Sequence, residues 1–228
     1  CRISHPVHGL IRFNTYNFQD DLLEKFSDNR FNVVLKARQM GISTIVAAYI
    51  VWLMLFHRDK SVLVIATKHE TATNLVRKSK AIMKNLPKWI QISGIVIDNR
   101  TSFELSNGSH VKASSTSGGA GRSEALSLLV IDEAAHVDGL EELWTGLYPT
   151  ISTGGRCIAL STPNGVGNWF HETYTNAEQS INMFYPTKLI WDLHPDRDMV
   201  WFDNETRNMS KREIAQEYEC NFNASGET

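Results

Sequence analysis

A segment near the start of the chain has the residue types of a phosphate-binding loop. It reads Lys36-Ala37-Arg38-Gln39-Met40-Gly41-Ile42-Ser43-Thr44 and stands between an apolar run and a helical pattern. A strand, a loop and a helix in that order present backbone N–H groups and a helix N-terminus to phosphates. If Gly41 is the second glycine of the pattern GxxxxGK[ST], Ser43 falls at the hydroxyl that binds Mg²⁺. The segment therefore predicts nucleotide binding.

The lysine of that pattern is missing, because Ile42 stands in its place. The same register puts Lys36 at the first glycine, and a loop that wraps a phosphate brings its two ends together. Lys36 can therefore reach the β- and γ-oxygens, and Arg38 is a second cation for the γ-phosphate, supplied by the same chain. The alternative interpretation is a dead loop, in which Ile42 marks lost activity.

A pair of carboxylates, Asp132 and Glu133, follows the apolar run Leu128 to Ile131. Ligands gather at the carboxyl ends of strands in open α/β sheets. In phosphate-loop NTPases an aspartate at this place holds Mg²⁺ and the next glutamate orients the attacking water. An acidic helix cap after a buried strand is the simpler interpretation. Together with the loop, the pair makes nucleotide hydrolysis the stronger hypothesis.

Two further segments have polar groups that a nucleotide site uses. Gln19, just ahead of the first strand, can bind an adenine edge or be an ordinary helix residue. Ser161, Thr162 and Pro163 follow another apolar run, so the hydroxyls of Ser161 and Thr162 can face the same crevice and sense the γ-phosphate. Pro163 and Gly165 make that segment a turn in either case.

Three other features have a structural and a functional interpretation. Arg122 stands in a Ser/Gly-rich loop, residues 114–123, which is either an ordinary mobile loop or an element that contacts nucleotide or DNA. His136 has no evident partner and is interpreted as structural. A basic helical segment is either a solvated face or a surface for phosphate backbones. Its cations are Arg77, Lys78, Lys80, Lys84 and Lys88.

Alternating apolar runs and helical patterns must position these residues. Continuous Val/Ile/Leu runs separated by helices are typical of a parallel sheet covered on both faces. The predicted strands are Phe31–Leu35, Ser61–Ala66, Leu126–Ile131 and Cys157–Leu160, and the predicted helices are Thr44–Phe56 and Glu70–Asn85.

An antiparallel extension and a small second subdomain complete the expected organisation. Residues 95–98, 101–105 and 110–113 are predicted antiparallel strands, with Asn107-Gly108 as a hairpin turn. Residues 198–205 and 211–219 are predicted short helices. We therefore expect an α/β core over residues 1–175 and a small helical subdomain over residues 176–228.

The composition is that of an intracellular globular protein without a membrane span. The 228 residues are 42% hydrophobic, which suffices for one substantial core, and the net charge of -2 excludes a uniformly basic nucleic-acid binder. Three scattered cysteines form no disulfide framework. The most apolar run, residues 45–56, is shorter than the ~20 residues that a membrane span needs.

The motifs resemble those of the large terminase subunits of tailed bacteriophages. Lys36 to Thr44, Val130 to Ala134 and Ser161 to Gly165 are similar to the family's motor motifs, and some members place the loop lysine at its start. Tyr16 to Gln19 is similar to the adenine-binding segment, and Phe103 to Ser109 to the strand and turn before an arginine-bearing loop. The resemblance extends over roughly residues 17–228.

The resemblance implies a RecA-like P-loop ATPase and a role for each matching residue. Lys36 is then the displaced phosphate-binding lysine and Arg38 the in-cis arginine. Ser43 and Asp132 hold Mg²⁺, and Glu133 is the catalytic carboxylate. The remaining implied roles are adenine contact for Gln19, coupling for Ser161, Thr162 and Pro163, and an arginine sensor at Arg122.

The family also implies partners and a place of action. These are ATP, Mg²⁺, double-stranded DNA, a portal protein, a small terminase subunit and further copies of the chain in a ring, at the procapsid in the host cytoplasm. A C-terminal nuclease domain is expected to be absent from this chain, and the isolated chain is expected to be a monomer without membrane contact.

Two alternatives remain open at this stage. A helicase-like translocase shares the glutamine segment, the loop and the Asp-Glu pair, but usually needs a second RecA-like domain, for which the chain has no room. Arg38 inside the loop instead favours a self-contained site. The other alternative is a nucleotide-binding module without turnover, which Ile42 favours.

Overall fold

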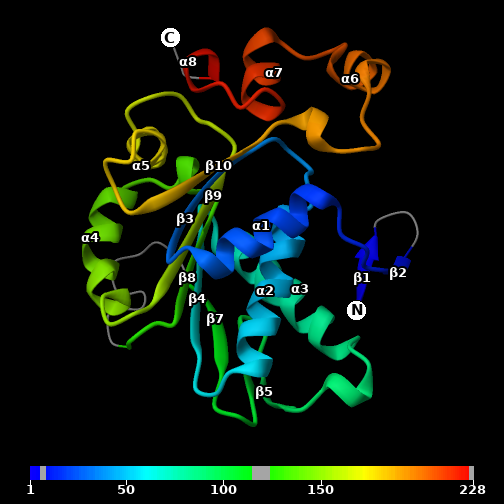
Figure 1. The fold of residues 1–228 in the computed structure, drawn as a ribbon, viewed down its shortest axis with the longest axis vertical. Coiled ribbons are helices and arrows are strands. Elements are labelled where there is room, and N and C mark those ends of the chain that lie inside the picture. The colour runs from blue at the N-terminus through cyan, green and yellow to red at the C-terminus, as the bar shows by residue number, and fades with distance from the viewer. Residues whose placement is uncertain (6–8, 115–123, 226–228) are drawn as a thin grey trace. The chain divides into compact units, whose positions relative to one another are not determined.

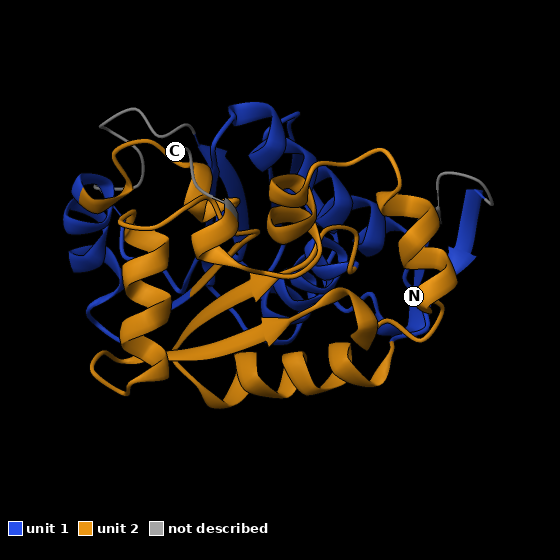
Figure 2. Cartoon of the chain, turned by 90° about the horizontal axis from the view of Figure 1, so that it is seen from above, with its two compact units in different colours: residues 1–15, 41–132, 142–157 blue, residues 16–40, 133–141, 158–228 orange. Residues whose placement is uncertain are grey.

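The structure is a computed structural model that describes residues 1–5, 9–114 and 124–225. The chain divides into two compact units that alternate along the sequence (Figure 2). The first unit comprises residues 1–15, 41–132 and 142–157, and the second comprises residues 16–40, 133–141 and 158–228.

Eight strands form a mostly parallel sheet in the order β10-β3-β9-β8-β4-β7-β6-β5. The parallel pairs include β4 with β7, β4 with β8 and β10 with β3, whereas β6 is antiparallel to both β5 and β7. The predicted α/β fold with an antiparallel extension is thereby confirmed. The strands are β3 (Phe31–Lys36), β4 (Ser61–Ala66), β5 (Ile95–Asp98), β6 (Ser102–Leu105), β7 (His110–Ser114), β8 (Leu128–Asp132), β9 (Arg156–Ser161) and β10 (Phe184–Leu189).

The first unit has a core built from β4, β8 and helix α2 (Ile42–Phe56). Every residue of β4 and β8 is buried, as their uninterrupted apolar sequences require for strands covered on both faces. Helix α2 is apolar around most of its circumference and packs against α3 (His69–Lys84), as Figure 1 shows. The unit also contains most of α4 (Leu140–Ile151), η1 (Lys88–Ile90) and a hairpin of β1 (Arg2–His5) with β2 (Gly9–Arg12).

The predicted turn at Asn107-Gly108 joins β6 to β7, with Gly108 at a positive φ of 84°. It also caps the end of α2. Asn107 Nδ2 donates to the carbonyls of Met54 (2.8 Å) and His57 (3.3 Å), and Ser109 Oγ donates to the carbonyl of His57 (2.9 Å). These side chains satisfy carbonyls that a helix C-terminus leaves without partners. The hairpin therefore stabilises the helix that follows the phosphate loop.

The second unit is built around the parallel pair β3–β10, against which both α1 (Asn17–Asp28) and α5 (Trp169–Glu178) pack. Lys36, at the end of β3, lies in register with Leu189, at the end of β10. Segment 176–228, predicted to be helical, thus also contains a strand of the sheet. It continues through η3 (Trp191–Leu193), α6 (Met199–Thr206), α7 (Lys211–Glu217) and α8 (Phe222–Ser225).

An aromatic cluster holds α6 and α7 together. Trp191 stacks on Phe202 with ring centroids 4.4 Å apart, and Tyr218 packs against Trp201 and Phe202 at 6.0 and 5.9 Å. Asp198 caps α6 by accepting from the Trp201 N–H, and Ser210 caps α7 in a capping box with Glu213. The two short helices predicted from the sequence are therefore confirmed. In the part of the chain that the structure covers, no helix combines the length and apolarity of a membrane span.

Candidate nucleotide site

The phosphate loop leaves β3 with its first two N–H groups already bonded. The Ala37 N–H donates to the carbonyl of Leu189, and the Arg38 N–H donates to that of Glu217, both at 2.7 Å. The first bond extends the β3–β10 pairing by one residue. The second ties the loop to α7. The start of the loop is therefore fixed by the backbone of the second unit.

Side chains from distant parts of this unit bind the loop's carbonyl groups. Arg197 donates to the carbonyls of Arg38 (3.2 Å) and Gln39 (2.9 Å). Gln19 Nε2 donates to the next carbonyl, that of Met40, at 3.0 Å. Gln39 has a φ of 57°, in the left-handed region that non-glycine residues rarely adopt. The loop is thus held in a conformation that its sequence alone does not favour.

Gln19, predicted to contact adenine, is buried with 3% of its surface exposed. Its Oε1 accepts from the Tyr16 N–H at 3.2 Å at the start of α1, while Nε2 donates to the Met40 carbonyl. Both ends of the amide therefore have partners within the second unit. The structure gives Gln19 a role in shaping the loop, and adenine contact stays a prediction.

The charges of Lys36 and Glu133 both act on the ring of His136. Burial lowers the pKa of the His136 ring, the carboxylates of Glu133 and Glu217 oppose that effect, and Lys36 adds to it. Lys36 ends β3 with its side chain half-buried. The loop lysine and the acidic residue therefore lie close enough to act on the same imidazole.

Arg38 pairs with Glu217 of α7 through Nη1 and Oε2 at 3.1 Å. The Arg38 side chain is 65% exposed and that of Glu217 is 17% exposed. An exposed ion pair of this kind contributes little to stability and can be exchanged readily. Arg38 thus projects from the loop into solvent, where a phosphate can reach it.

Glu133 has a strained backbone immediately after β8. Its φ of 55° lies in the left-handed region, and its side chain is exposed at the start of η2 (Ala134–His136). Residues held in this region cost of order 1–3 kcal/mol and cluster at functional sites. The turn directs the chain away from β8 at the residue predicted to orient the attacking water.

The segment Ser161–Pro163 is hydrogen-bonded to the turn that follows Glu133. The buried Ser161 Oγ accepts from the Ala135 N–H at 3.1 Å, and Thr162 Oγ1 lies 3.2 Å from His136 Nε2. Asn164 Nδ2 donates to the Ala135 carbonyl at 3.2 Å. His136, interpreted from the sequence as structural, is thus one of these links. The predicted coupling segment and the predicted catalytic residue belong to one hydrogen-bonded assembly.

The first unit carries the other predicted residues, Gly41 to Thr44 and Asp132. Gly41, with a φ of 73°, is the N-cap residue of α2 and has no side chain with which to cap the helix. Ser43 is half-buried, and Asp132 is 5% exposed at the carboxyl end of β8. A hydroxyl and a carboxylate are oxygen donors of the kind that Mg²⁺ takes when phosphates supply further ligands. The donor chemistry therefore fits the predicted ion.

Metal binding by protein groups alone has no candidate in the described ranges. No group of three His, Cys, Asp or Glu side chains is placed to hold an ion there. Arg122, the predicted sensor, lies outside the described residues, as does most of its loop.

Arg197 and Glu217 were not identified from the sequence, because no local pattern marks them. They lie 159 and 179 residues from their partner Arg38. Tyr16 and His194 form a similar long-range contact, with ring centroids 4.6 Å apart, and Tyr16 Oη donates to Asp196 at 3.1 Å. The signal that locates them is the fold itself, which returns the chain after β10 to the loop.

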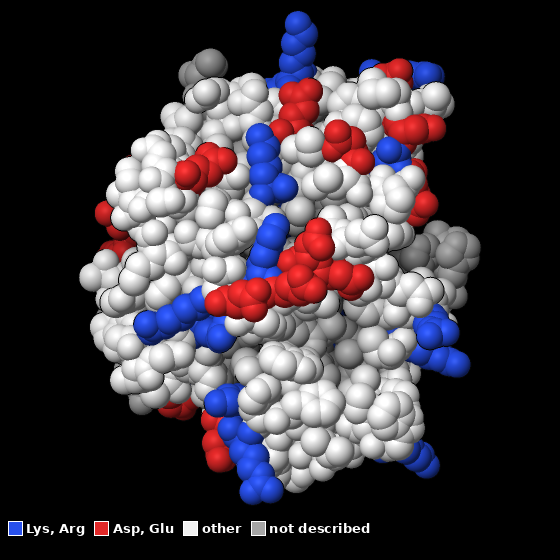
Figure 3. All heavy atoms as spheres, in the orientation of Figure 1, with Lys and Arg blue, Asp and Glu red and all other residues white. Residues whose placement is uncertain are grey.

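The basic face of α3 is partly neutralised in the structure. Asp98 bonds Lys80 and Lys84, and these hydrogen bonds hold the pKa of the Asp98 carboxyl down at about 2. Acidic and basic side chains also stand side by side on the face drawn in Figure 3. The two ion pairs of Asp98 favour the interpretation of α3 as a solvated helix face.

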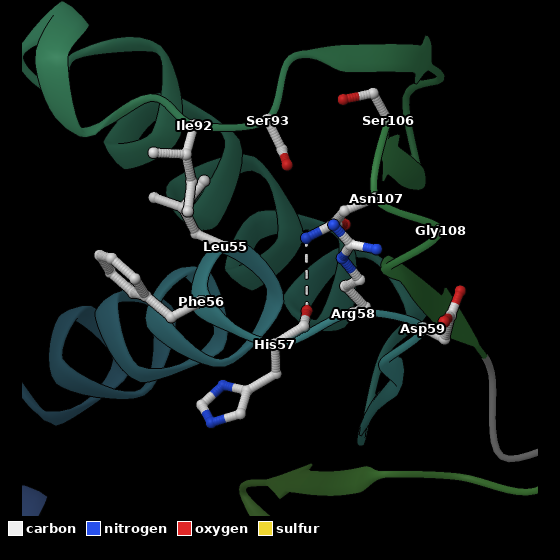
Figure 4. Close-up of a pocket in the computed structure, with 10 residues that line it drawn as sticks. All are labelled: Leu55, Phe56, His57, Arg58, Asp59, Ile92, Ser93, Ser106, Asn107 and Gly108. Carbon is white, nitrogen blue, oxygen red and sulfur yellow. Dashed lines mark hydrogen bonds between the residues drawn. The ribbon is translucent and has the colours of Figure 1, made fainter.

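A cavity of about 720 Å³ lies near the amino end of β4 in the first unit (Figure 4). Leu55 and Ile92 line one side of it, and Arg58 and Asn107 line another. It borders the amino end of β4, whereas Asp132 pairs with the carboxyl end, roughly 17 Å along the strand at 3.3 Å per residue. None of the predicted site residues lines this cavity, so it is not the predicted nucleotide site.

Comparisons with known proteins agree on one group of relatives. Residues 33–228 match the family model described as terminase large subunit, T4likevirus-type, N-terminal. The terminase large subunit of Escherichia phage T5 is 26% identical over 202 residues, which cover 85% of this chain and 44% of that protein. The chain therefore spans less than half the length of this curated relative.

Solved structures show the same fold at low sequence identity. The ATPase domain of the Thermus phage P74-26 large terminase superposes with a TM-score of 0.77 at 19% identity, covering 92% of this chain and 94% of that one. The large terminase of a thermophilic bacteriophage, solved in complex with ATP-gamma-S, gives a TM-score of 0.73 at 11% identity, covering 92% of this chain and 53% of that one.

Proposed function

Because the chain belongs to the family of N-terminal regions of T4likevirus-type terminase large subunits, we propose that it hydrolyses ATP to drive the packaging of double-stranded viral DNA. The resemblance seen in the sequence motifs is confirmed by this membership. The observation that carries the proposed chemistry is the loop between β3 and α2. The loop follows directly on Lys36 and continues into the N-terminus of α2, where the N-cap residue, Gly41, has no side chain to bind the first N–H groups of the helix.

ATP binding rests on the donors that this loop offers. The positive end of α2 and the N–H groups of the loop attract phosphate oxygens. Lys36 and Arg38 add two cations, and we assign them to the β/γ-phosphates and to charge on the transferring phosphoryl group. The loop residues assigned to ATP are Lys36, Ala37, Arg38, Gln39, Met40, Gly41, Ile42, Ser43 and Thr44.

Catalysis is assigned to Glu133, as the residue that orients the attacking water. Its exposed carboxylate stands on a strained turn next to Asp132 in the chain. Ser43 and Asp132 would hold Mg²⁺, which when bound supplies charge neutralisation at the phosphate oxygens.

Loss of the γ-phosphate would be transmitted from this turn to the rest of the second unit. The bonds from Ala135 and His136 to Ser161 and Thr162 supply the path, and Pro163 completes the coupling segment. The response that we propose is a shift of the predicted subdomain, residues 176–228, confined to the part after β10, because β10 itself is paired with β3. In the assembled motor the partners would be the portal protein, the small terminase subunit, DNA and further copies of the chain, in the host cytoplasm.

The test is Mg²⁺-dependent ATP hydrolysis by the 228-residue chain and by Lys36→Ala and Glu133→Gln. We expect Lys36→Ala to weaken ATP binding and turnover, and Glu133→Gln to bind ATP while turnover falls at least a hundredfold, the order of loss for one catalytic group. Lys188→Ala is the matched control, because Lys188 is an exposed lysine on β10 in register with Leu35.

Two results would contradict the proposal. Undiminished hydrolysis by Glu133→Gln would remove the catalytic assignment. Equal hydrolysis by wild type, Lys36→Ala and Lys188→Ala would show that Lys36 does not replace the lysine missing at position 42.

A further inference from the structure

Three consecutive peptide carbonyls in the phosphate loop are held by side chains that lie far away in the sequence. Arg197 Nη1 binds the carbonyl of Arg38 and Nη2 binds that of Gln39. Gln19 Nε2 binds the carbonyl of Met40. The Arg197 guanidinium also lies 3.4 Å from Met40 Sδ through Nη1. The two side chains therefore fix the orientation of three successive peptide planes.

Fixing a carbonyl also fixes the N–H of the next residue. In a planar trans peptide the C=O and N–H groups point in opposite directions, and the described chain has no cis peptide bond. The carbonyls of Arg38, Gln39 and Met40 share their peptide planes with the N–H groups of Gln39, Met40 and Gly41. These three N–H groups consequently point away from Arg197 and Gln19.

The same three N–H groups have no acceptor among the residues that the structure describes, whereas those of Ala37 and Arg38 are bonded to Leu189 and Glu217. Successive N–H groups directed to one side form a concave anion site, and alternating left-handed residues favour that shape. Gln39 and Gly41 supply the left-handed residues, at φ 57° and 73°.

Arg197 also accounts for the strain at Gln39. A non-glycine residue in the left-handed region persists only where its surroundings over-determine it. The carbonyls that Arg197 binds belong to the peptides on both sides of the Gln39 Cα, so one guanidinium restrains both backbone angles of that residue. A bidentate fork of this kind requires arginine, since lysine presents its donors at a single point.

Arg197 is itself held in place. Its guanidinium carbon lies 4.5 Å from the centre of the Trp201 ring. The backbone N–H of Arg197 donates to the His194 carbonyl at 3.0 Å. Trp201 belongs to the aromatic cluster of α6 and α7. The cation is therefore preorganised by the segment after β10.

We propose that Arg197 is a positioning residue of the nucleotide site, which shapes the phosphate-binding N–H groups of Gln39, Met40 and Gly41 by holding the carbonyls behind them. The inference rests on the proposed function for the identity of the ligand, a nucleoside di- or triphosphate. It adds a residue with no direct contact to that ligand.

The test compares Arg197→Met with Arg207→Met in the full 228-residue chain. Arg207 is an exposed arginine just after α6 whose guanidinium bonds Asn204 in its own turn, so it matches the change in charge without touching the loop. We expect Arg197→Met to raise the Kd for ADP and the KM for ATP on the order of tenfold, with kcat within about threefold, as for a loss of binding common to ground and transition states. Arg207→Met should leave all three unchanged.

A spectroscopic readout separates positioning from a general loss of structure. Addition of pyrophosphate should shift the backbone amide NMR signals of Gln39, Met40 and Gly41 in the wild type and in Arg207→Met, and shift them much less in Arg197→Met. Signals from β4 and β8 should stay in place in all three proteins. If Arg197→Met does not fold, Arg197→Lys is measured instead, and at least a threefold weaker ADP affinity is expected.

ADP affinity and amide shifts equal to wild type, in Arg197→Met or in a folded Arg197→Lys, would overturn the proposal. The outcome is separable from that of the proposed function. A wild-type chain that binds ADP but never hydrolyses ATP contradicts the hydrolysis and leaves the role of Arg197 to be decided by binding. Normal hydrolysis with an unchanged KM in Arg197→Met contradicts the role of Arg197 alone.

Discussion

Arg38 and Glu217 stand 179 residues apart and are joined by two bonds. The Arg38 N–H donates to the Glu217 carbonyl at 2.7 Å, and its guanidinium pairs with the Glu217 carboxylate at 3.1 Å. Only the second bond depends on the glutamate side chain. A substitution at Glu217 therefore releases the arginine head group and leaves the backbone link in place.

Glu217→Gln should retain ATP hydrolysis, whereas Arg38→Ala should lose it on the order of a hundredfold or more. The Arg38 side chain is largely exposed, so loss of the ion pair should cost less than about 1 kcal/mol of unfolding free energy. Steady-state kinetics and urea titration of both variants measure these effects. A fall in turnover in Glu217→Gln as large as that in Arg38→Ala would show that hydrolysis requires the ion pair and not the Arg38 cation alone.

Glu133→Gly should stabilise the chain relative to Glu133→Gln while both variants are inactive. Glycine adopts the φ of 55° without the steric cost that a side chain adds, which is about 1–2 kcal/mol. Its more flexible unfolded chain offsets about 0.5–1 kcal/mol of that gain. The expected gain is about 0.5–1 kcal/mol in urea unfolding at constant m. If the glycine variant is the less stable of the two, the turn is not strained in the way proposed.

Gly155→Ala should destabilise the first unit by about 2 kcal/mol or more, within the range of overpacking. A Cβ at this position would stand 2.2 Å from the backbone carbonyl oxygen of Leu126 and 3.0 Å from the Ile151 Cα, and neither can rotate away. Gly94→Ala is the matched control, because its Cβ meets nothing within 4 Å. That variant should be neutral or up to about 1 kcal/mol more stable. Comparable thermal unfolding of the two variants would contradict this packing.

Thr187→Val should be neutral or stabilising by up to about 1 kcal/mol. The Thr187 hydroxyl is buried in β10 and has no hydrogen-bond partner within the described ranges. Valine has nearly the same shape and removes the unsatisfied group. Thr206→Val serves as the control. The Thr206 hydroxyl donates to the Phe202 carbonyl at 2.7 Å, so its removal should lower the free energy of unfolding. Destabilisation of Thr187→Val beyond that of Thr206→Val would indicate a partner for Thr187.

His136 should make the stability of the chain fall in mild acid. Burial lowers its pKa in the folded chain from the ordinary 6.5, so the unfolded chain binds the proton more readily. The contribution is complete above about pH 6.5 and is lost as the pH falls below that value. His136→Gln should therefore lose less unfolding free energy than wild type between about pH 7.5 and about pH 5.5.

The measurement for His136 is urea unfolding at several pH values, with His194→Gln as the comparison. Burial also lowers the pKa of His194, so that variant should remove a separate part of the same dependence. Parallel stability profiles of wild type and His136→Gln would show that the carboxylates of Glu133 and Glu217 cancel the effect of burial on the His136 pKa.

The sequence allowed prediction of the elements that have a strong pattern of their own. Strand β4 was found because both of its faces are buried and every residue is apolar or small. Strand β10 was missed because its exposed and buried residues alternate and Pro186 interrupts the pattern, which is tolerated at a sheet edge. Helices α4 and α5 were also missed, the latter because its mean apolar character is weak.

The residues of the candidate site likewise divide into those that a local motif marks and those that only the fold brings together. The loop, the Asp-Glu pair and the segment after β9 are local motifs, so their residues could be named from spacing alone. Arg197 and Glu217 meet the loop only because β10 returns the chain to the end of β3. A contact between residues so far apart leaves no periodicity or motif, and only the folded chain identifies it.

The place of the missing lysine is occupied by a core residue. Ile42 is 2% exposed, packed into the first unit at the start of α2. A lysine there would be a buried cation, which is costly without a partner. The two placements of the phosphate lysine are therefore not interchangeable by one mutation. An Ile42→Lys exchange would restore the common motif and would also place a cation in the core of the first unit before any phosphate is bound.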